Sequence, residues 1–380
     1  MKKTLLTTSA LAGVVFVAGS AFAEAPKVTF SGSTDYYVRM TDYDTPTGGT
    51  EPQNGPGWDI NQHAVASELI WDANATADNG LQFGANVQLR YAGAAGAVST
   101  DEAWIDFAGS WGRVVLGDDD GVLDNNQVSG ASVLPVAAYD TGRFTGSLAT
   151  PAGWASPTGT NGSVGEASSD VSKIAYYSPS FAGFSVAVSA TPDSSSEYGA
   201  ANTATAVATG ATTSYSNILE GTVNYKGDFS GVGVALYAGG AAGEANATLG
   251  AARDDLSAWQ VGGSVSVAGF SLGLGYGDSD DSGCLTVQSG CESGKFFNAG
   301  LAYNFGAGAV GIGYATTFDA KATTAGTEME ARYYSIDASY TIAQGLTGYG
   351  GVMFATRDNN AVTNSEADST VFVLGTRVNF

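Results

Sequence analysis

The clearest pattern along the chain is a strict alternation of apolar and polar residues in short segments. Between Leu81 and Tyr91, apolar side chains occupy every second position, and Gln, Gly, Asn and Arg fill the positions between them. A period of two places the two sets on opposite faces of a β-strand. The same alternation recurs around Val28–Arg39, Phe270–Tyr276 and Tyr334–Ile342. Each segment therefore predicts a strand with one apolar face and one water-facing face.

Segments of this kind recur along the whole chain. Marking all of them predicts about 16 strands, each long enough for a tilted membrane span. Their centres lie near residues 33, 68, 86, 105, 115, 174, 187, 220, 234, 261, 273, 299, 313, 335, 351 and 374. An even number of antiparallel strands is typical of a closed barrel made by one chain.

The connections between these segments alternate between tight and long. Tight turns rich in Gly, Asn, Asp, Ser and Pro are predicted at 78–80, 111–112, 178–180, 227–228, 268–269, 306–308 and 344–345. Long polar connections are predicted at 41–62, 92–99, 119–170, 192–213, 239–253, 278–293, 319–328 and 358–368. A water-soluble β-sandwich or propeller also has alternating strands, but neither requires this alternation of loop lengths. The pattern indicates an all-β fold, a 16-stranded antiparallel transmembrane β-barrel.

The two ends of the chain agree with an outer-membrane location. Two lysines, an apolar stretch from Leu11 to Ala18 and the small-x-small site Ala21–Ala23 predict a cleaved signal peptide over 1–23 and a mature barrel over 24–380. An uncleaved anchor is the alternative, although the apolar core is short for a span. The last strand ends on Phe380, as expected where a terminal aromatic anchors at a membrane interface.

Composition narrows the classes of function. The formal net charge of -22 argues against nucleic acid, whose phosphates require a basic face. The sole histidine, His63, lies beside a long loop, where a solvated residue is expected rather than a catalytic base, so the chain is not expected to be an enzyme. The only cysteines, Cys284 and Cys291, lie close together in a polar stretch and predict a local disulfide, because metal or thiol chemistry would need further ligands.

One connection, 119–170, is far longer than the others. The interior of a 16-stranded barrel is too wide for wall side chains to fill, so a loop folded into the pore would narrow it. This third loop carries an apolar run, Val133–Tyr139, which indicates that part of it packs against the wall. Strand parity points Arg39, Arg90 and Lys173 into the lumen, opposite the acids of the loop, and Arg377 inwards but low on the last strand. The predicted pore-constriction residues are Asp118, Asp119, Asp120, Asp124, Arg39, Arg90 and Lys173.

The chain resembles the trimeric general diffusion porins of Gram-negative bacteria, most closely their alphaproteobacterial branch. The resemblance runs from Lys27–Gly32 to Phe380 and includes Trp111–Gly117, which is similar to the segment before the constriction loop of that family. It implies a homotrimer of separate pores in the outer membrane, with lipid and lipopolysaccharide around it. It also implies that Phe380 is the membrane-insertion signal read by the barrel-assembly machinery.

The function expected from this resemblance is passive diffusion of ions and small hydrophilic solutes. A substrate-specific outer-membrane channel for a sugar or organic acid is the alternative, and an adhesin or envelope tether would need a plugged lumen or an extra domain. No resident cofactor or metal is expected. Some members of the family bind calcium near this loop, and Asp118–Asp120 and Asp124 offer oxygen ligands for it.

Overall fold

The computed structural model describes most of the chain. It covers residues 25–46, 48–52, 55–62, 67–92, 97–151, 168–194, 196–197, 200–201, 214–246, 252–287, 290–292, 294–321, 328–360, 363 and 365–380. The predicted signal peptide, His63 and residues 152–167 of the long loop lie outside the described residues.

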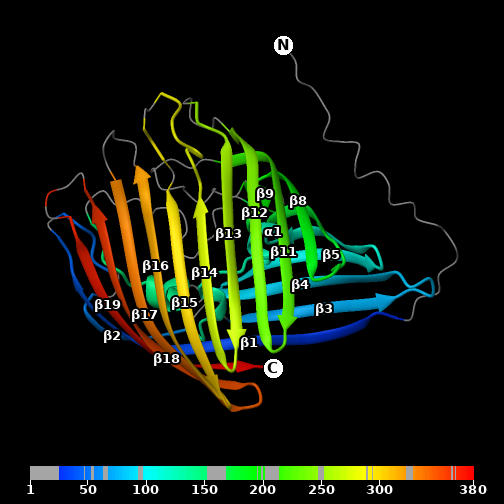
Figure 1. The fold of residues 1–380 in the computed structure, drawn as a ribbon, viewed down its shortest axis with the longest axis horizontal. Coiled ribbons are helices and arrows are strands. Elements are labelled where there is room, and N and C mark those ends of the chain that lie inside the picture. Colours follow the sequence, from blue (N-terminus) through cyan, green and yellow to red (C-terminus); the bar gives the residue numbers. More distant parts are fainter. Residues whose placement is uncertain are drawn as a thin grey trace.

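Long strands dominate the part of the chain that the structure describes (Figure 1). The first half contains β1 (Lys27–Asp44), β2 (Gly57–Gln62), β3 (Glu68–Thr76), β4 (Gln82–Ala92), β5 (Ala97–Gly109), β6 (Gly112–Asp119), β7 (Val171–Tyr177), β8 (Phe184–Asp193), β9 (Ser196–Glu197) and β10 (Ala200–Ala201). The second half contains β11 (Ser214–Phe229), β12 (Val232–Asn246), β13 (Leu256–Val267), β14 (Phe270–Asp278), β15 (Lys295–Phe305), β16 (Gly308–Lys321), β17 (Glu328–Ala343), β18 (Leu346–Asn359) and β19 (Ala367–Asn379). The described part of the connection between β6 and β7 holds four short helices: α1 (Val122–Asn125), η3 (Ala131–Val133), η4 (Ala138–Asp140) and α2 (Gly142–Thr145).

The strands form a closed antiparallel barrel. Each long strand pairs with the next one along the chain, and β1 closes the ring by pairing with β19, from Ser33↔Asn379 to Asp44↔Asp368. β2 and β3 pair with successive halves of the same edge of β1, so together they form one wall strand. The described residues therefore build 16 wall strands, which confirms the predicted fold class.

The structure corrects several boundaries of the sequence prediction. Residues 41–44 and 239–246, predicted as loop, belong to β1 and β12, because both segments continue the backbone pairing of their strands. Residues 57–62, predicted as loop, form β2, because they find backbone partners on β1 from Tyr36 to Thr41. The turn predicted at 227–228 lies at Ser230–Gly231, where φ is 57° and 88°. Two successive positive φ angles are what a two-residue hairpin turn needs, and Gly231 supplies the second at little steric cost.

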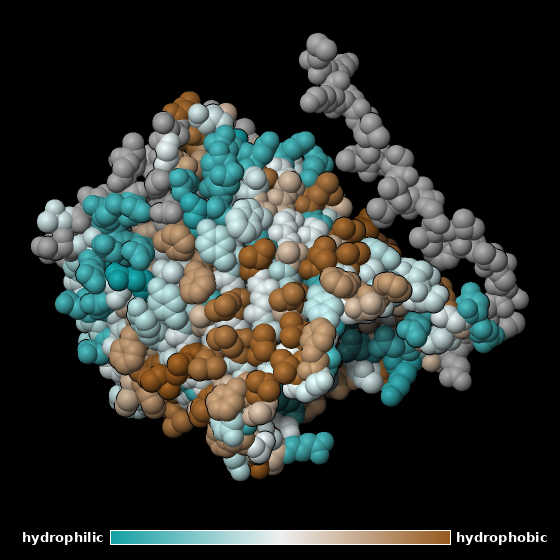
Figure 2. All heavy atoms as spheres, in the orientation of Figure 1, coloured by the Kyte–Doolittle hydropathy of each residue, from teal (hydrophilic) through white to brown (hydrophobic). Residues whose placement is uncertain are grey.

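The outer and inner faces of the barrel differ as the alternation predicts. On β1, Tyr36, Val38 and Met40 are exposed on the outside, whereas Asp35 and Arg39 are buried on the inside. Figure 2 shows hydrophobic residues gathered across the middle of the strands and hydrophilic residues towards the loops. None of the helices in the described part of the chain is long and apolar enough to cross a membrane.

The C-terminal residue is fixed to the first strand. Gly32 donates its N–H to the carbonyl of Phe380 at 2.9 Å, and Phe380 donates back to the carbonyl of Gly32 at 3.0 Å. The ring of Phe380 lies 6.3 Å from that of Phe30 and remains 56 % exposed. A side chain added to Gly32 would collide with the backbone carbonyl of Glu68, so this end of the wall requires glycine there.

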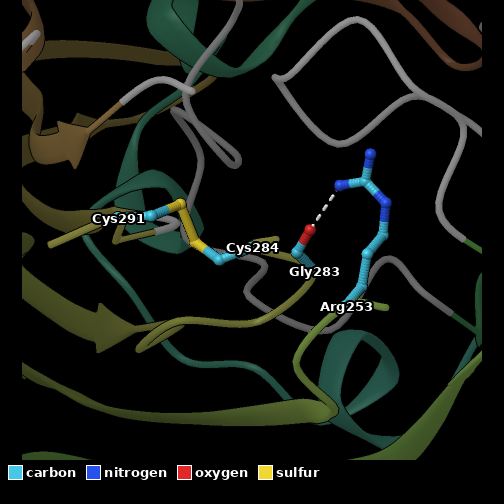
Figure 3. The surroundings of a disulfide bond; sticks show 4 residues. All are labelled: Arg253, Gly283, Cys284 and Cys291. Atoms are coloured by element: carbon cyan, nitrogen blue, oxygen red, sulfur yellow. Dashed lines mark hydrogen bonds between the residues drawn. A yellow bond between two sulfur atoms is a disulfide. The ribbon is translucent and has the colours of Figure 1, made fainter. Parts of the chain in front are cut away.

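The loop after β14 is closed by the predicted disulfide between Cys284 and Cys291 (Figure 3). The same loop is tied to the one before β13, since Arg253 donates to the carbonyl of Gly283 at 2.6 Å and Asp254 donates its N–H to the carbonyl of Cys284 at 2.8 Å. The disulfide therefore fixes a pair of neighbouring loops rather than the barrel wall.

Removing this disulfide should loosen the loops and leave the barrel intact. A short loop closed by a disulfide gains about 2 kcal/mol, chiefly by restricting the open state. We expect the Cys284→Ser/Cys291→Ser variant to be cut faster by proteases between 279 and 294. The heat resistance of the barrel on a denaturing gel should not change, and a clear loss of that resistance would contradict this local role.

Candidate functional site

The loop between β6 and β7 lies against the inner wall. Of its residues, 120–151 and 168–170 are described. Its helices contact the wall strands in order: α1 contacts β8, β11 and β12, η3 contacts β14 and β15, η4 contacts β16 to β18, and α2 contacts β19 and β1. Near the end of the described segment 120–151, Thr150 exchanges two backbone hydrogen bonds with Thr50, at 2.8 and 3.0 Å. The described segment therefore follows a large part of the inner circumference.

Apolar side chains of the loop pack on the wall at two places. Leu134, Tyr139, Phe144 and Leu148 join a cluster with wall residues that include Tyr333. The remaining wall members of this first cluster include Tyr37, Ala315, Ala331, Tyr349, Met353, Val371 and Val373. Because fully burying one large apolar side chain is worth about 1.5–3 kcal/mol, this cluster contributes strongly to holding the loop.

The second apolar contact lies near the start of the loop. Leu123 and Val128 pack with Tyr237, Ile218 and Phe296 of the wall. The hydroxyl of Tyr237 also donates to the Leu123 carbonyl at 2.8 Å. Tyr139 of the first cluster lies in η4, outside the wall strands. Its burial, together with the nearby charges of Asp140 and Asp337, raises the pKa of its phenol, so this group stays neutral at ordinary pH.

Polar groups of the wall receive the backbone N–H groups of the loop. Glu220 accepts from Leu123 N–H at 3.3 Å, and Asp337 accepts from Ala138 N–H at 3.3 Å. Asn298 accepts from the N–H of Gly130 at 2.7 Å, and Ser369 Oγ accepts from that of Ala149 at 3.0 Å. Irregular backbone inside a barrel must find such partners, because a buried N–H without one costs about 1–3 kcal/mol.

The strongest polar contact between loop and wall is the pair of Arg143 and Asp35. Arg143 donates from Nη2 and Nε to Asp35 Oδ2, at 2.6 and 3.1 Å. Arg377 donates to the same oxygen at 3.2 Å, and the hydroxyl of Tyr349 donates to the other oxygen. Asp35 is 0 % exposed, and the Arg143 guanidinium lies 4.9 Å from the ring centre of Tyr349. One wall carboxylate thus holds the α2 part of the described loop.

Of the predicted constriction cations, Arg39 and Arg90 have ionic partners on the wall or at its edge. Arg39 pairs with Asp59 of β2 at 2.8 Å. Arg90 pairs with Glu68 of β3 at 2.9 Å and with Asp101 of β5. The Lys173 ammonium, 3 % exposed, donates to the carbonyl of Val171 at 2.6 Å. The loop–wall ion pair that the structure describes is therefore made by Arg143, with the acid on the wall.

The predicted acids lie at the start of the loop. Asp118 accepts from Ser172 Oγ at 2.8 Å, and Asp120 accepts from Ser169 Oγ at 2.9 Å. Asp119 accepts from the N–H of Asp120 at 2.9 Å. Asp124 lies further on, exposed in α1. The predicted residues therefore do not all lie together. One group, near the ends of β5 to β7, contains Asp118–Asp120, Arg90 and Lys173. Arg39 and Asp124 lie at separate positions.

Three carboxylates come close enough together to share a cation. Oxygen atoms of Glu102, Asp120 and Asp170 lie within 4.8 Å of one another. Glu102 belongs to β5, and the other two stand at the two ends of the long loop. Hard cations such as calcium bind sets of carboxylate oxygens of this kind.

The wall residues that anchor the loop were not singled out from the sequence. Asp35, Glu220 and Asp337 occupy positions of the polar face in alternating strands, so the alternation places them inside. What the sequence lacks is a local signal for their partners, since Arg143 follows Asp35 by 108 residues and Ala138 precedes Asp337 by 199. An inward carboxylate on a wall strand is the signal that could have found them.

A closed 16-stranded barrel with an apolar outside, a polar inside and an internal loop defines an outer-membrane β-barrel channel. The family described as Gram-negative porin matches residues 7–360, and the chain belongs to this family. It is accordingly an outer-membrane diffusion channel and not an enzyme. No curated protein sequence matches the chain significantly.

Solved structures with the same fold include several outer-membrane channels. The anion-selective porin from Comamonas acidovorans is 17 % identical, with a TM-score of 0.61 over 93 % of this chain and 100 % of that one. The OmpT protein of Vibrio cholerae in its trimer form is 12 % identical, with a TM-score of 0.59 over 94 % and 100 %. The DcaP channel of Acinetobacter baumannii is 11 % identical, with a TM-score of 0.61 over 94 % and 98 %. At these identities the likeness establishes the shared fold.

Breaking the Asp35–Arg143 pair should release the α2 part of the loop from the wall. Removing one partner of a buried ion pair typically costs about 3–5 kcal/mol, because the other charge stays buried. We expect trypsin to cut folded Asp35→Asn protein after Arg143 much faster than wild type, as read by mass spectrometry. Asp42→Asn, an exposed position on the same strand, is the matched control. Equal resistance of Asp35→Asn and the control would contradict the anchoring role.

Proposed function

We propose that the 119–170 loop is the constriction of a general diffusion channel, through which ions and small hydrophilic solutes pass down their gradients. The observation that carries this proposal is the path of the loop along the inner wall, anchored by Asp35, Glu220 and Asp337. A loop packed on the wall narrows a wide barrel without plugging it. The predicted group Asp118–Asp120, Arg90 and Lys173 would then border the narrowed lumen, because these residues lie where the loop leaves and rejoins the wall.

The assembly follows from the family. We propose a homotrimer in which each subunit holds its own pore, since OmpT of Vibrio cholerae, which has the same fold, is described in a trimer form. Outer-membrane lipid and lipopolysaccharide would contact the exposed apolar face. The exposed ring of Phe380, at the end of the last strand, supports a role as the signal read by the barrel-assembly machinery.

Narrowing by the loop can be tested with a cysteine placed on its exposed side. Ser132 lies in η3 and its side chain is exposed. In planar bilayers, we expect a charged, water-soluble thiol reagent to lower the conductance of Ser132→Cys channels in steps, three per trimer. Because Cys284 and Cys291 are paired, they should not react.

The matched control is Ser230→Cys, at an exposed position in the turn between β11 and β12. Its labelling should leave the conductance unchanged, since that turn lies on the rim. Unchanged conductance of fully labelled Ser132→Cys would contradict the constriction. Conductance that saturates with one class of solute would favour a substrate-specific channel over general diffusion.

We further propose that calcium binds between the loop and the wall, at Glu102, Asp120 and Asp170. Three carboxylates this close repel one another unless a cation or protons neutralise them. We expect millimolar calcium to raise the unfolding temperature of the wild-type protein and chelator to reverse this. Asp120→Asn should lose the shift and Asp254→Asn, in an outer loop, should keep it. A shift that persists in Asp120→Asn would contradict this site.

A further inference from the structure

The wall from β3 to β7 carries many more acidic than basic side chains. Its buried and half-buried acids are Glu68, Asp72, Asp101, Glu102, Asp106, Asp118 and Asp119. Its basic side chains are Arg90, Arg113 and Lys173. The helices of the loop contact the wall from β8 round to β1, so this acidic sector completes the circumference between them.

Part of the negative charge in this sector is already neutralised. Arg90 forms ion pairs with Glu68 and Asp101, and Arg113 pairs with Asp106 at 2.9 Å. Arg113 is also held over the ring of Trp104, at 4.7 Å from its centre. Both arginines are therefore committed to wall acids and are not available to others.

A second set of acids accepts its side-chain hydrogen bonds from uncharged groups, although Asp120 also lies near the Lys173 ammonium. Asn86 Nδ2 donates to Asp72 at 2.7 Å, and the Gln88 amide donates to Glu102. Serine hydroxyls donate to Asp118 and to Asp120, at 2.8 and 2.9 Å. Amides and hydroxyls stabilise a carboxylate but leave its charge in place. We call these four residues, Asp72, Glu102, Asp118 and Asp120, the acidic wall.

An orphaned oxygen in the acidic wall points independently to a cation. Asp118 is 1 % exposed, and its Oδ2 has no hydrogen-bond partner among the described residues. The neighbouring Asp101, 7 % exposed, likewise has no such partner for its Oδ2. Buried carboxylate oxygens normally have a partner, because leaving one without any is costly. A passing cation or its hydration water would supply it.

We propose that the acidic wall makes this channel selective for cations over anions. The inference rests on the proposed function as an open diffusion channel and names the class of ion that channel prefers. Rows of carboxylates along a narrow aqueous path raise the local concentration of cations and repel anions. The chain would then differ from the Comamonas acidovorans porin of the same fold, which is anion-selective.

The size of the effect follows from the potential at the wall. A potential of about −1 kT, at the low end for charged clefts, enriches K⁺ over Cl⁻ by about seven-fold. Screening should reduce this preference strongly between ~0.1 M and ~1 M salt, because the Debye length falls from ~10 Å to ~3 Å.

The test is the reversal potential of trimers in planar bilayers across a KCl gradient, with chelator present so that calcium does not mask the acids. We expect the potential to have the sign of K⁺ selectivity. The variant Asp72→Asn/Glu102→Gln/Asp118→Asn should move the permeability ratio of K⁺ to Cl⁻ at least half of the way to one. The matched control, Asp78→Asn/Asp228→Asn/Asp254→Asn, removes the same charge from a turn, the exposed end of β11 and an outer loop, and should leave the ratio unchanged.

The outcomes separate this inference from the proposed function. Normal conductance steps with Cl⁻ selectivity, or with no selectivity, would overturn the acidic wall alone, and this result needs no variant to fold. An equal loss of selectivity in the control and the acidic-wall variant would also overturn it. Silent bilayers from folded wild-type trimers would overturn the proposed channel, and this inference with it.

Discussion

The arrangement of this molecule depends on buried carboxylates of the barrel wall that bind the long internal loop. Asp35 receives the guanidinium of Arg143, and Glu220 and Asp337 receive backbone N–H groups of α1 and η4. A loop inside a barrel carries many backbone donors and no neighbouring strand to accept from them. Carboxylates on the polar face of the wall solve this problem, and they determine where the loop lies.

In the ion pair that holds the loop, this polarity is opposite to the one expected from the sequence. An acidic loop facing a basic wall would place loop carboxylates against Arg39, Arg90 and Lys173. In the structure, Arg39 and Arg90 are bound by Asp59, Glu68 and Asp101 at the wall. The acids at the start of the loop lie beside the Lys173 ammonium and the other acids of β5 and β6. Carboxylates that do not bind the loop keep their charge at the lumen, where they can interact with passing ions.

Most of the wall could be predicted from the sequence because its signals are local. A period of two, interrupted by turn residues, identifies the strands, and the spacing of Cys284 and Cys291 identifies the disulfide. The shift of one turn from 227–228 to Ser230–Gly231 arose because both dipeptides contain a turn-forming glycine. β2 was missed since its backbone partners on β1 are set by the closed ring, not by its own six residues.

The path of the loop could not be predicted in the same way. The apolar run Val133–Tyr139 indicates packing against something, but only the folded barrel brings Tyr333 and Met353 to it. Similarly, no local pattern joins Arg143 to Asp35 across 108 residues. Contacts between a loop and strands this distant depend on the diameter of the closed barrel and on which wall positions face inwards.

The most direct test of the central claim is a cross-link between the loop and the wall. The hydroxyls of Thr41 on β1 and Ser147 in the loop lie 3.0 Å apart, and both residues are buried. In Thr41→Cys/Ser147→Cys protein isolated from outer membranes, the account predicts a 41–147 disulfide, found by mass spectrometry, and a single-channel conductance equal to that of the reduced protein. Two cysteines that stay reduced and reactive, or a conductance that changes when they are joined, would contradict it.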